Sequence, residues 1–285
     1  MDLCNREELK KLLARHGFHF SKSMGQNFLV EAWAPRDIAA ACAGTPGHAV
    51  LEIGPGVGTL TRALAPRVGK VVAVELDRAL LPLLAETVGE YPNVEIISGD
   101  VMKLDLDKVI EERFSGYTPI VCANLPYNIT TPVLTKLLES KHFQSITVMI
   151  QREVARRICA QPGSGDYGAF SLFCQYHARC EYRFEVGPEC FMPPPKVTSA
   201  VVTLTPRPRP EEVEDETAFF RVTRAAFSQR RKTLSNCLSS AYGNCYSKDA
   251  LREILARCGL PEDVRGERLG IPEFAELAKA LSRGI

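Results

Sequence analysis

One short stretch of the sequence combines groups that could hold a planar amine. The apolar run 119–123 is followed by Asn124, Leu125, Pro126 and Tyr127. An amide oxygen and a nearby main-chain carbonyl can accept the two N–H bonds of an aromatic amine, and Pro126 helps to aim the carbonyl before it because its ring fixes φ. The face of Tyr127 could hold an unstacked base. The structural alternative is a strand that ends in a proline turn.

A glycine-rich turn follows another apolar run. Residues 48–53 lead into Gly54, Gly56 and Gly58. Glycines between a strand and a helix let the backbone approach a ligand, because no Cβ intervenes, although a tight connection would use them equally well. A dinucleotide fingerprint needs its third glycine where Thr59 stands. This departure weakens a nicotinamide or flavin interpretation.

Acidic residues end the next two apolar runs. Residues 70–75 finish with Glu75, whose carboxylate could accept both ribose hydroxyls of a nucleoside, and residues 94–98 are followed by Asp100, which could accept from an adenine amine. Asp77 is better explained as a helix cap, and Asp100 alone would be a turn residue. With the glycine turn, these strand ends predict a pocket for a ligand with an adenosine half.

The spacing of apolar residues predicts the elements that position these groups. Strands alternate with helices, which predicts an α/β fold with a parallel sheet and helices on both faces. The expected strands are 48–53, 70–75, 94–98, 119–123 and 145–150, and the expected helices between them are 59–65, 77–88, 106–113 and 131–139.

A composition shift predicts a second domain. The run 207–210 alternates arginine with proline, acidic residues follow it, and the chain beyond has only helical periodicity. A chain of 285 residues that is 45% hydrophobic can bury two cores. We therefore expect a ligand-binding domain over residues 1–208 and a small all-α domain over residues 209–285.

Charge and cysteine usage limit the function classes. With 35 Lys and Arg against 34 Asp and Glu, the chain is not globally basic, so a polyanion would have to bind local patches. No stretch reaches the roughly 18 apolar residues of a membrane span. The ten cysteines show no C-x-x-C pair and no metal-ligand spacing. We expect a cytoplasmic protein with reduced cysteines and no metal.

Taken together, the motifs resemble those of the ribosomal RNA adenine dimethyltransferases, which use S-adenosylmethionine. The resemblance covers nearly the whole chain, in the runs 23–29, 51–58, 74–77, 99–100, 124–128, 191–197 and 227–234. It implies a Rossmann-like class I methyltransferase sheet. It is strongest to members that dimethylate the N6 amines of two adjacent adenosines near the 3′ end of small-subunit (16S) ribosomal RNA, a reaction linked to ribosome biogenesis.

The resemblance also implies roles for individual residues. The cofactor contacts would be Asn27, Leu29, Gly54, Gly56, Glu75, Asp100, Val101 and Asn124. The catalytic set would be Asn124, Leu125, Pro126, Tyr127 and Phe191, with the target adenine between the two aromatic rings. Without the resemblance, Phe191 is better explained by packing before the prolines at 193–195. No residue need act as a general base, so catalysis would be positioning and electrostatics.

Two basic clusters could follow an RNA backbone. The first is predicted on one helix, and the second at the start of a helix in the second domain; they comprise Arg152, Arg156 and Arg157, and Arg230, Arg231 and Lys232. The alternative for each residue is a solvated, salt-bridged helix face, for which Glu153 and Arg157 form a suitable pair.

The resemblance leaves two rival functions open. One is a methyltransferase of the resistance type that acts on large-subunit ribosomal RNA. The other is a non-catalytic ribosome-assembly or transcription factor that keeps the fold for nucleic-acid binding. The expected partner is small-subunit ribosomal RNA or an immature small subunit, and nothing in the sequence requires more than a monomer.

Overall fold

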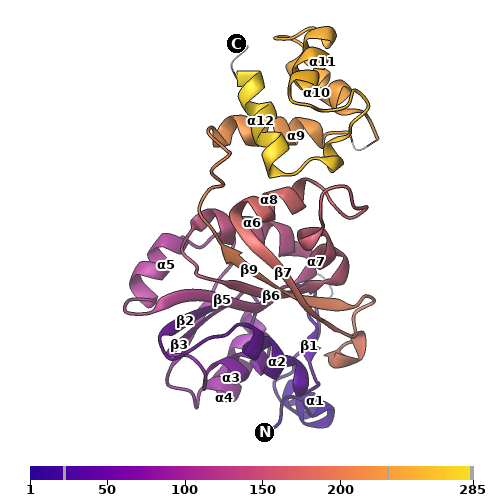
Figure 1. Cartoon of the computed structure of the whole chain (residues 1–285). Helices are drawn as coiled ribbons and strands as arrows, with labels where there is room; N and C mark the ends of the chain where they lie inside the picture. The colour runs from indigo at the N-terminus through magenta and orange to yellow at the C-terminus, as the bar shows by residue number, and fades with distance from the viewer. Residues whose placement is uncertain (22–23, 230, 283–285) are drawn as a thin grey trace. The chain divides into compact units, whose positions relative to one another are not determined.

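The computed structural model describes residues 1–21, 24–229 and 231–282. The chain forms two compact units (Figure 1). The first contains Met1–Ala155 and Ala178–Pro206, and the second contains Arg156–His177 and Arg207–Ile285. The second division, after Pro206, lies two residues before the predicted boundary. The helical segment 156–177 differs from the prediction, because it belongs to the second unit.

A seven-stranded sheet organises the first unit, in the order β4-β3-β2-β5-β6-β9-β7. The five strands from β4 to β6 are parallel, whereas β9 runs antiparallel to both of its neighbours. The sheet strands are β2 (His48–Ile53), β3 (Lys70–Glu75), β4 (Val94–Ser98), β5 (Thr118–Asn124), β6 (Ile146–Gln151), β7 (Ala178–Val186) and β9 (Ser199–Pro206). The predicted parallel arrangement thus holds for β2 to β6. No helix connects β7 to β9, so this pair forms without a crossover.

Helices cover both faces of this sheet, as predicted. Figure 1 shows α2, α3 and α4 on one face and α5 and α6 on the other. The bounds are α2 (Trp33–Ala41), α3 (Thr59–Leu64), α4 (Leu81–Val88), α5 (Leu106–Arg113) and α6 (Thr130–Ser140), with short 3₁₀ turns η2 (Arg78–Leu80) and η3 (Tyr127–Ile129). Because both faces are covered, the central strands are mostly apolar, and Leu51, Val72 and Val121 are fully buried.

The N-terminal helix packs behind the glycine turn. Asn5 caps α1 (Arg6–Arg15) by accepting from the backbone N–H groups of Glu7 and Glu8. Its apolar stripe joins a cluster that includes Leu12, Phe28 and Val57.

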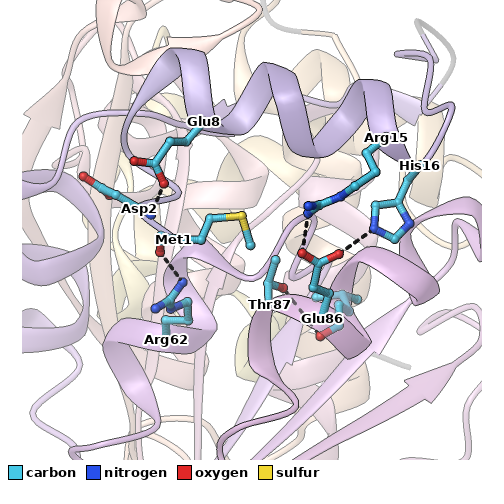
Figure 2. Close-up of polar contacts among 9 residues, drawn as sticks. Met1, Asp2, Glu8, Arg15, His16, Arg62, Glu86 and Thr87 are labelled. Atoms are coloured by element: carbon cyan, nitrogen blue, oxygen red, sulfur yellow. Dashed lines mark hydrogen bonds and ion pairs between the residues drawn. The ribbon is translucent and has the colours of Figure 1, made fainter.

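Polar contacts also fasten the N-terminal region to the helices around it. Figure 2 shows Arg15 and His16 reaching Glu86 of α4, and Arg62 of α3 donating to the carbonyl of Met1. The N-terminal segment is therefore part of the framework under the turn.

A two-stranded sheet joins segments that lie far apart in the sequence. Strand β1 (Phe28–Leu29) pairs antiparallel with β8 (Phe191–Met192), which follows the 3₁₀ turn η4 (Pro188–Cys190), so that Leu29 lies opposite Phe191. The N–H of Val30 adds a hydrogen bond of 2.8 Å to the carbonyl of Cys190. This pairing brings the loop at 24–29 beside the edge of the main sheet where the parallel strands end.

The second unit is helical and has its own core. Its helices are α8 (Ala169–His177), α9 (Glu216–Ala226), α10 (Leu234–Tyr242), α11 (Lys248–Arg257) and α12 (Ile271–Ser282), with a 3₁₀ turn η5 (Gly266–Arg268). Tyr167 and Tyr176 pack in one cluster with Phe219 and Phe274, and Tyr167 Oη donates to the carbonyl of Leu269 at 3.0 Å. These contacts explain why segment 156–177 belongs with the C-terminal helices.

One predicted helix begins later than expected. Helix α10 starts at Leu234, after Thr233 in an extended conformation with φ −66° and ψ 155°. Arg231 and Lys232 lie in the turn before it, so the prediction that they open a helix is wrong; Arg230 lies outside the described residues.

The structure adds two facts about membrane spans and thiols. Among the described residues, no helix has both the length and the apolar composition needed to cross a bilayer. All ten cysteines are free thiols, and five are buried: Cys42, Cys122, Cys174, Cys190 and Cys237.

Removal of the Leu12 side chain should destabilise the first unit. Leu12 is 1% exposed in the cluster behind the glycine turn. We expect Leu12→Ala to lower the free energy of unfolding by roughly 2 to 5 kcal/mol, from lost burial and a residual cavity. Urea denaturation followed by circular dichroism measures it. Lys11→Ala removes an exposed side chain from the same helix and is the control; equal losses in both variants would contradict the packing described.

Candidate active site

A cleft runs along the edge of the sheet where β2, β3, β4 and β5 end. The space between its lining residues amounts to about 1090 Å³, open solvent at its mouth included. The structure brings all the predicted cofactor residues to its lining: Asn27, Leu29, Gly54, Gly56, Glu75, Asp100, Val101 and Asn124. Leu125, Pro126 and Tyr127 line it too. Contact of these residues with a cofactor stays a prediction.

The glycine turn leaves its backbone open to the cleft. Gly54 and Gly56 adopt left-handed φ values of +68° and +62°, which other residues reach only with strain. A Cβ on Gly56 would lie 3.0 Å from the ring of Phe28, so the close approach of β1 also requires glycine there. At Gly54 the nearest atom to such a Cβ is Pro126 Cδ at 3.7 Å, an ordinary van der Waals contact, so the left-handed φ rather than a clash favours glycine there.

Glu75 links the glycine turn to the end of β3. It is buried at 5% exposure; its Oε2 accepts from the N–H of Gly56 at 3.2 Å, and its Oε1 accepts from the N–H of Asp77 at 2.8 Å. Burial raises the pKa of Glu75, and the two backbone donors act against that rise. Each oxygen keeps a further lone pair, so the carboxylate can still accept hydroxyl groups of a ribose.

A second carboxyl group lies below the turn. Glu52 is 1% exposed, and its Oε2 has no hydrogen-bond partner among the described residues. Burial raises the pKa of Glu52 to about 8, and the negative charge of Glu75 contributes to the same rise. Glu52 is therefore mostly protonated at neutral pH, and one of these two acids carries no charge.

The cleft has the electrostatics of a site for a cationic ligand. Besides the protonated Glu52, the acidic residues Glu75, Asp77 and Asp100 line it, and no lysine or arginine appears among the described lining residues. Asp100 Oδ1 accepts from the N–H of Met102 at 2.9 Å. Ligands rich in phosphate are disfavoured here, whereas a sulfonium with an adenosine half fits the charges.

Asn124 ends β5 with its amide group oriented. The amide nitrogen Nδ2 donates to the carbonyl of Asn27 at 3.4 Å, and the next residue is tied to the sheet because Leu125 N–H donates to Met149 O at 3.1 Å. With its NH₂ engaged, Asn124 has Oδ1 left to accept an N–H from a ligand. The carbonyl of Leu125 precedes Pro126, which offers no competing N–H.

Tyr127 is anchored at the far end of its ring. It is half-buried in η3, and its Oη lies 2.7 Å from Ser199 Oγ. Burial raises the pKa of Tyr127, and the bond to Ser199 opposes that rise. The phenol is thus neutral at physiological pH and can serve as an uncharged face for a base.

Phe191 does not line the cleft. Its ring is fully buried in a cluster that includes Leu29, Ile38 and Met149. Its backbone pairs with Leu29 in the two-stranded sheet. The arrangement favours a packing role, which is the alternative that the sequence left open for Phe191.

A side-chain hydrogen bond that the sequence did not predict holds the N-terminal loop. Gln26 Nε2 donates to Asp77 Oδ2 at 2.7 Å, which ties the loop to the end of β3. Asp77 Oδ1 meanwhile caps η2 by accepting from Ala79 N–H, so its predicted capping role is confirmed. A loop glutamine that bonds a strand-end acid 51 residues away has no local pattern that reveals it.

The described residues of the two basic clusters occupy exposed or half-exposed positions. Arg152, Arg156 and Arg157 share α7 (Arg152–Cys159), as predicted, and Arg152 Nη1 lies 3.3 Å from Glu185 Oε2. That ion pair matches the salt-bridged alternative for Arg152. Arg156, Arg157, Arg231 and Lys232 are exposed in the second unit. Their contact with RNA stays a prediction. No group of three or more described His, Cys, Asp or Glu residues could hold a metal ion.

Comparison with known sequences identifies close relatives. The model of the ribosomal RNA adenine dimethylase family matches residues 17–265. The ribosomal RNA small subunit methyltransferase A of Alkaliphilus oremlandii (strain OhILAs) is 45% identical over 281 residues, which cover 98% of each chain. The protein of the same name from Geobacillus thermodenitrificans (strain NG80-2) is 45% identical over 284 residues, which cover 98% of this chain and 97% of the relative.

Solved structures share the fold. A dimethyladenosine transferase from Plasmodium falciparum aligns with a TM-score of 0.76 at 23% identity, over 90% of this chain and 98% of its own. The 23S rRNA methyltransferase ErmE aligns with a TM-score of 0.67 at 24% identity, over 90% of this chain and 99% of its own. At these identities the likeness concerns the fold, and it confirms the predicted Rossmann-like methyltransferase sheet.

The buried Glu52 carboxyl should make stability depend on pH. Between its ordinary pKa of 4.5 and about 8, the folded protein keeps a proton that the unfolded chain has lost. Stability should therefore fall as pH rises through this window, by an amount on the order of a few kcal/mol. Urea denaturation of the ligand-free protein at several pH values measures the slope.

The matched variants are Glu52→Gln and Glu111→Gln. Glu52→Gln keeps the shape and removes the titration, so the slope should flatten. Glu111→Gln removes an exposed carboxyl of α5 and should leave the slope unchanged. An unchanged slope in Glu52→Gln would show that other groups carry the pH dependence.

Proposed function

The chain belongs to the ribosomal RNA adenine dimethylase family, and we propose that it dimethylates the N6 amines of two adjacent adenosines near the 3′ end of small-subunit ribosomal RNA. The methyl donor of the family is S-adenosylmethionine. The observation that carries the proposal is the placement of Asn124 in the same acidic cleft as Glu75 and Asp100. Identity of about 45% over nearly the whole chain to small-subunit methyltransferases supports the choice of RNA.

The cleft suits the cofactor on its own chemistry. The glycine turn that lines the cleft at Gly54, the remaining lone pairs of Glu75 and the side chain of Asp100 fit a nucleoside with backbone, ribose and adenine contacts. When bound, S-adenosylmethionine supplies an electrophilic methyl group. Glu75 and Asp100 would hold the nucleoside, while the backbone at Gly54 lies against it.

The residues at the end of β5 would prepare the amine. An adenine amine is a poor nucleophile, because its lone pair is delocalised into the ring. If Asn124 Oδ1 and the carbonyl of Leu125 accept its two N–H bonds, the nitrogen is favoured in a pyramidal form with its lone pair directed outward. Tyr127 holds the base, and the proton leaves the product nitrogen after transfer. No side chain need act as a general base.

The proposal includes the partner and the setting. The RNA-binding role falls to Arg152, Arg156, Arg157, Arg231 and Lys232 as phosphate contacts, with Arg230 in the same sequence cluster. The protein would act on an immature small subunit in the cytoplasm. We propose that it acts as a monomer, because nothing in the sequence requires more than one chain. A non-catalytic factor would not need Glu75, Asp100 and Asn124 together.

The RNA substrate can be tested directly. The protein is incubated with labelled S-adenosylmethionine and either unmethylated small subunits or large subunits. We expect label in small-subunit RNA, mapped by mass spectrometry to two adjacent adenosines. Label found only in large-subunit RNA would establish the rival resistance-type activity, and no label in either would support a non-catalytic factor.

Two variants should separate cofactor binding from methyl transfer. Asn124→Ala should lower the single-turnover rate by about 10²- to 10³-fold, because it removes an acceptor for the amine. Glu75→Gln should weaken cofactor affinity, because a carboxylate that accepts two hydroxyl groups becomes an amide that accepts less well. Calorimetry gives cofactor Kd and rapid quench gives the rate.

The pattern of these two effects is the control. We expect Glu75→Gln to approach the unaltered rate at saturating cofactor, and Asn124→Ala to stay slow there. Full transfer activity in Asn124→Ala would refute the assigned role of the amide.

A further inference from the structure

A buried serine on a distant strand contacts the ring that would hold the base. Ser199 is fully buried, and its Oγ lies 2.7 Å from Tyr127 Oη. We propose that Ser199 is a positioning residue: it fixes the position of the Tyr127 ring and thereby the position of the target adenine. This inference rests on the proposed function, because it assigns Tyr127 to the base.

Ser199 is held on both sides. It is the first residue of β9, where it pairs with Gln151 of β6 and with Val186 of β7. Just before it, the carbonyl of Thr198 accepts the N–H of Arg152 at 3.0 Å. A side chain with one χ angle on a strand between two others has little freedom, so its hydroxyl is a fixed point.

Tyr127 has no such support from its own segment. It lies in the single 3₁₀ turn between Pro126 and α6, it is only half-buried, and it faces the cleft. Pro126 restrains the backbone at one end of the side chain. The bond to Ser199 restrains the opposite end, at Oη. Between these two points the ring axis is defined, although little packing defines it on the cleft side.

The consequence for catalysis is geometric. A base that stacks on Tyr127 takes its position from the ring, and a misplacement of about 1 Å at a reacting centre can cost a hundredfold in rate. Ser199 touches neither the base nor the cofactor in this scheme. It acts through Tyr127, so its loss should change the transfer step and leave cofactor binding intact.

A double-mutant cycle tests the inference. Ser199→Ala and Tyr127→Phe each remove the same hydrogen bond and keep the ring. Each should lower the single-turnover methyl-transfer rate by about tenfold. The double variant should be no slower than the slower single variant, because the shared interaction can be lost only once. Ser199→Thr keeps the hydroxyl and should recover most of the rate.

Three further measurements distinguish positioning from general damage. Cofactor Kd should stay within about twofold in Ser199→Ala, since the cofactor side of the cleft is unchanged. Fluorescence of 2-aminopurine at the target position should show weaker stacking. The control is Thr203→Val, which removes a hydroxyl from the same strand where it bonds Thr147 at 3.2 Å, and it should leave rate and fluorescence unchanged.

Each other outcome overturns the inference. Full activity in Ser199→Ala shows that the contact does not position the ring, and multiplicative losses in the double variant show that the two hydroxyls act separately. Equal loss in Thr203→Val shows a structural effect of strand β9. The cycle uses whichever ribosomal RNA the unaltered protein methylates, so failure on small subunits would refute the proposed substrate without affecting the Ser199 test.

Discussion

The site depends on the contacts that hold the loop at 24–29 against the edge of the sheet where the parallel strands end. Strand β1 pairs with β8, Gln26 bonds Asp77 at the end of β3, and the carbonyl of Asn27 accepts from Asn124 at the end of β5. A primary amide has a donor end and an acceptor end. The hydrogen bond from the NH₂ group of Asn124 therefore fixes the direction in which its oxygen points. The loop therefore helps to form the cleft and also orients the group on which amine recognition depends.

Burial and charge balance one another below that loop. Two backbone N–H donors stabilise the charged form of Glu75, which can therefore accept further hydrogen bonds. Glu52 is 1% exposed and its Oε2 has no partner among the described residues, and burial raises its pKa to about 8. Two buried anions so close together would repel each other at high cost, and protonation of one removes that cost. The cleft can thus concentrate acidic residues around a cationic ligand while the folded state carries fewer charges than the sequence implies.

Local patterns were enough to predict the five parallel strands, the helices between them and the residues at the strand ends, because parallel strands bring their C-terminal ends to one edge. What local patterns could not reveal depends on contacts between distant segments. Segment 156–177 belongs to the helical unit through Tyr167 and Tyr176, whose partners lie far along the chain. Phe191 lies in the run 191–197 that resembles the adenine dimethyltransferases. Its ring is in the core, and its backbone pairs with Leu29. Neither partner is encoded by spacing, so sequence periodicity could not reveal them.

The two sides of the site also differ in origin. The parallel strands β2 to β5 carry the proposed nucleoside contacts directly at their ends, where one residue type per strand suffices. The base side needs the antiparallel β9, because Tyr127 stands on a single 3₁₀ turn and its hydroxyl meets Ser199 from that strand. In a parallel sheet with helical crossovers, every strand ends at the same edge. Only an antiparallel strand such as β9 begins at that edge, and its first residue can then contact the site. The reversal of β9, which lies between β6 and the edge strand β7, supplies this second point of support for the ring that would hold the adenine.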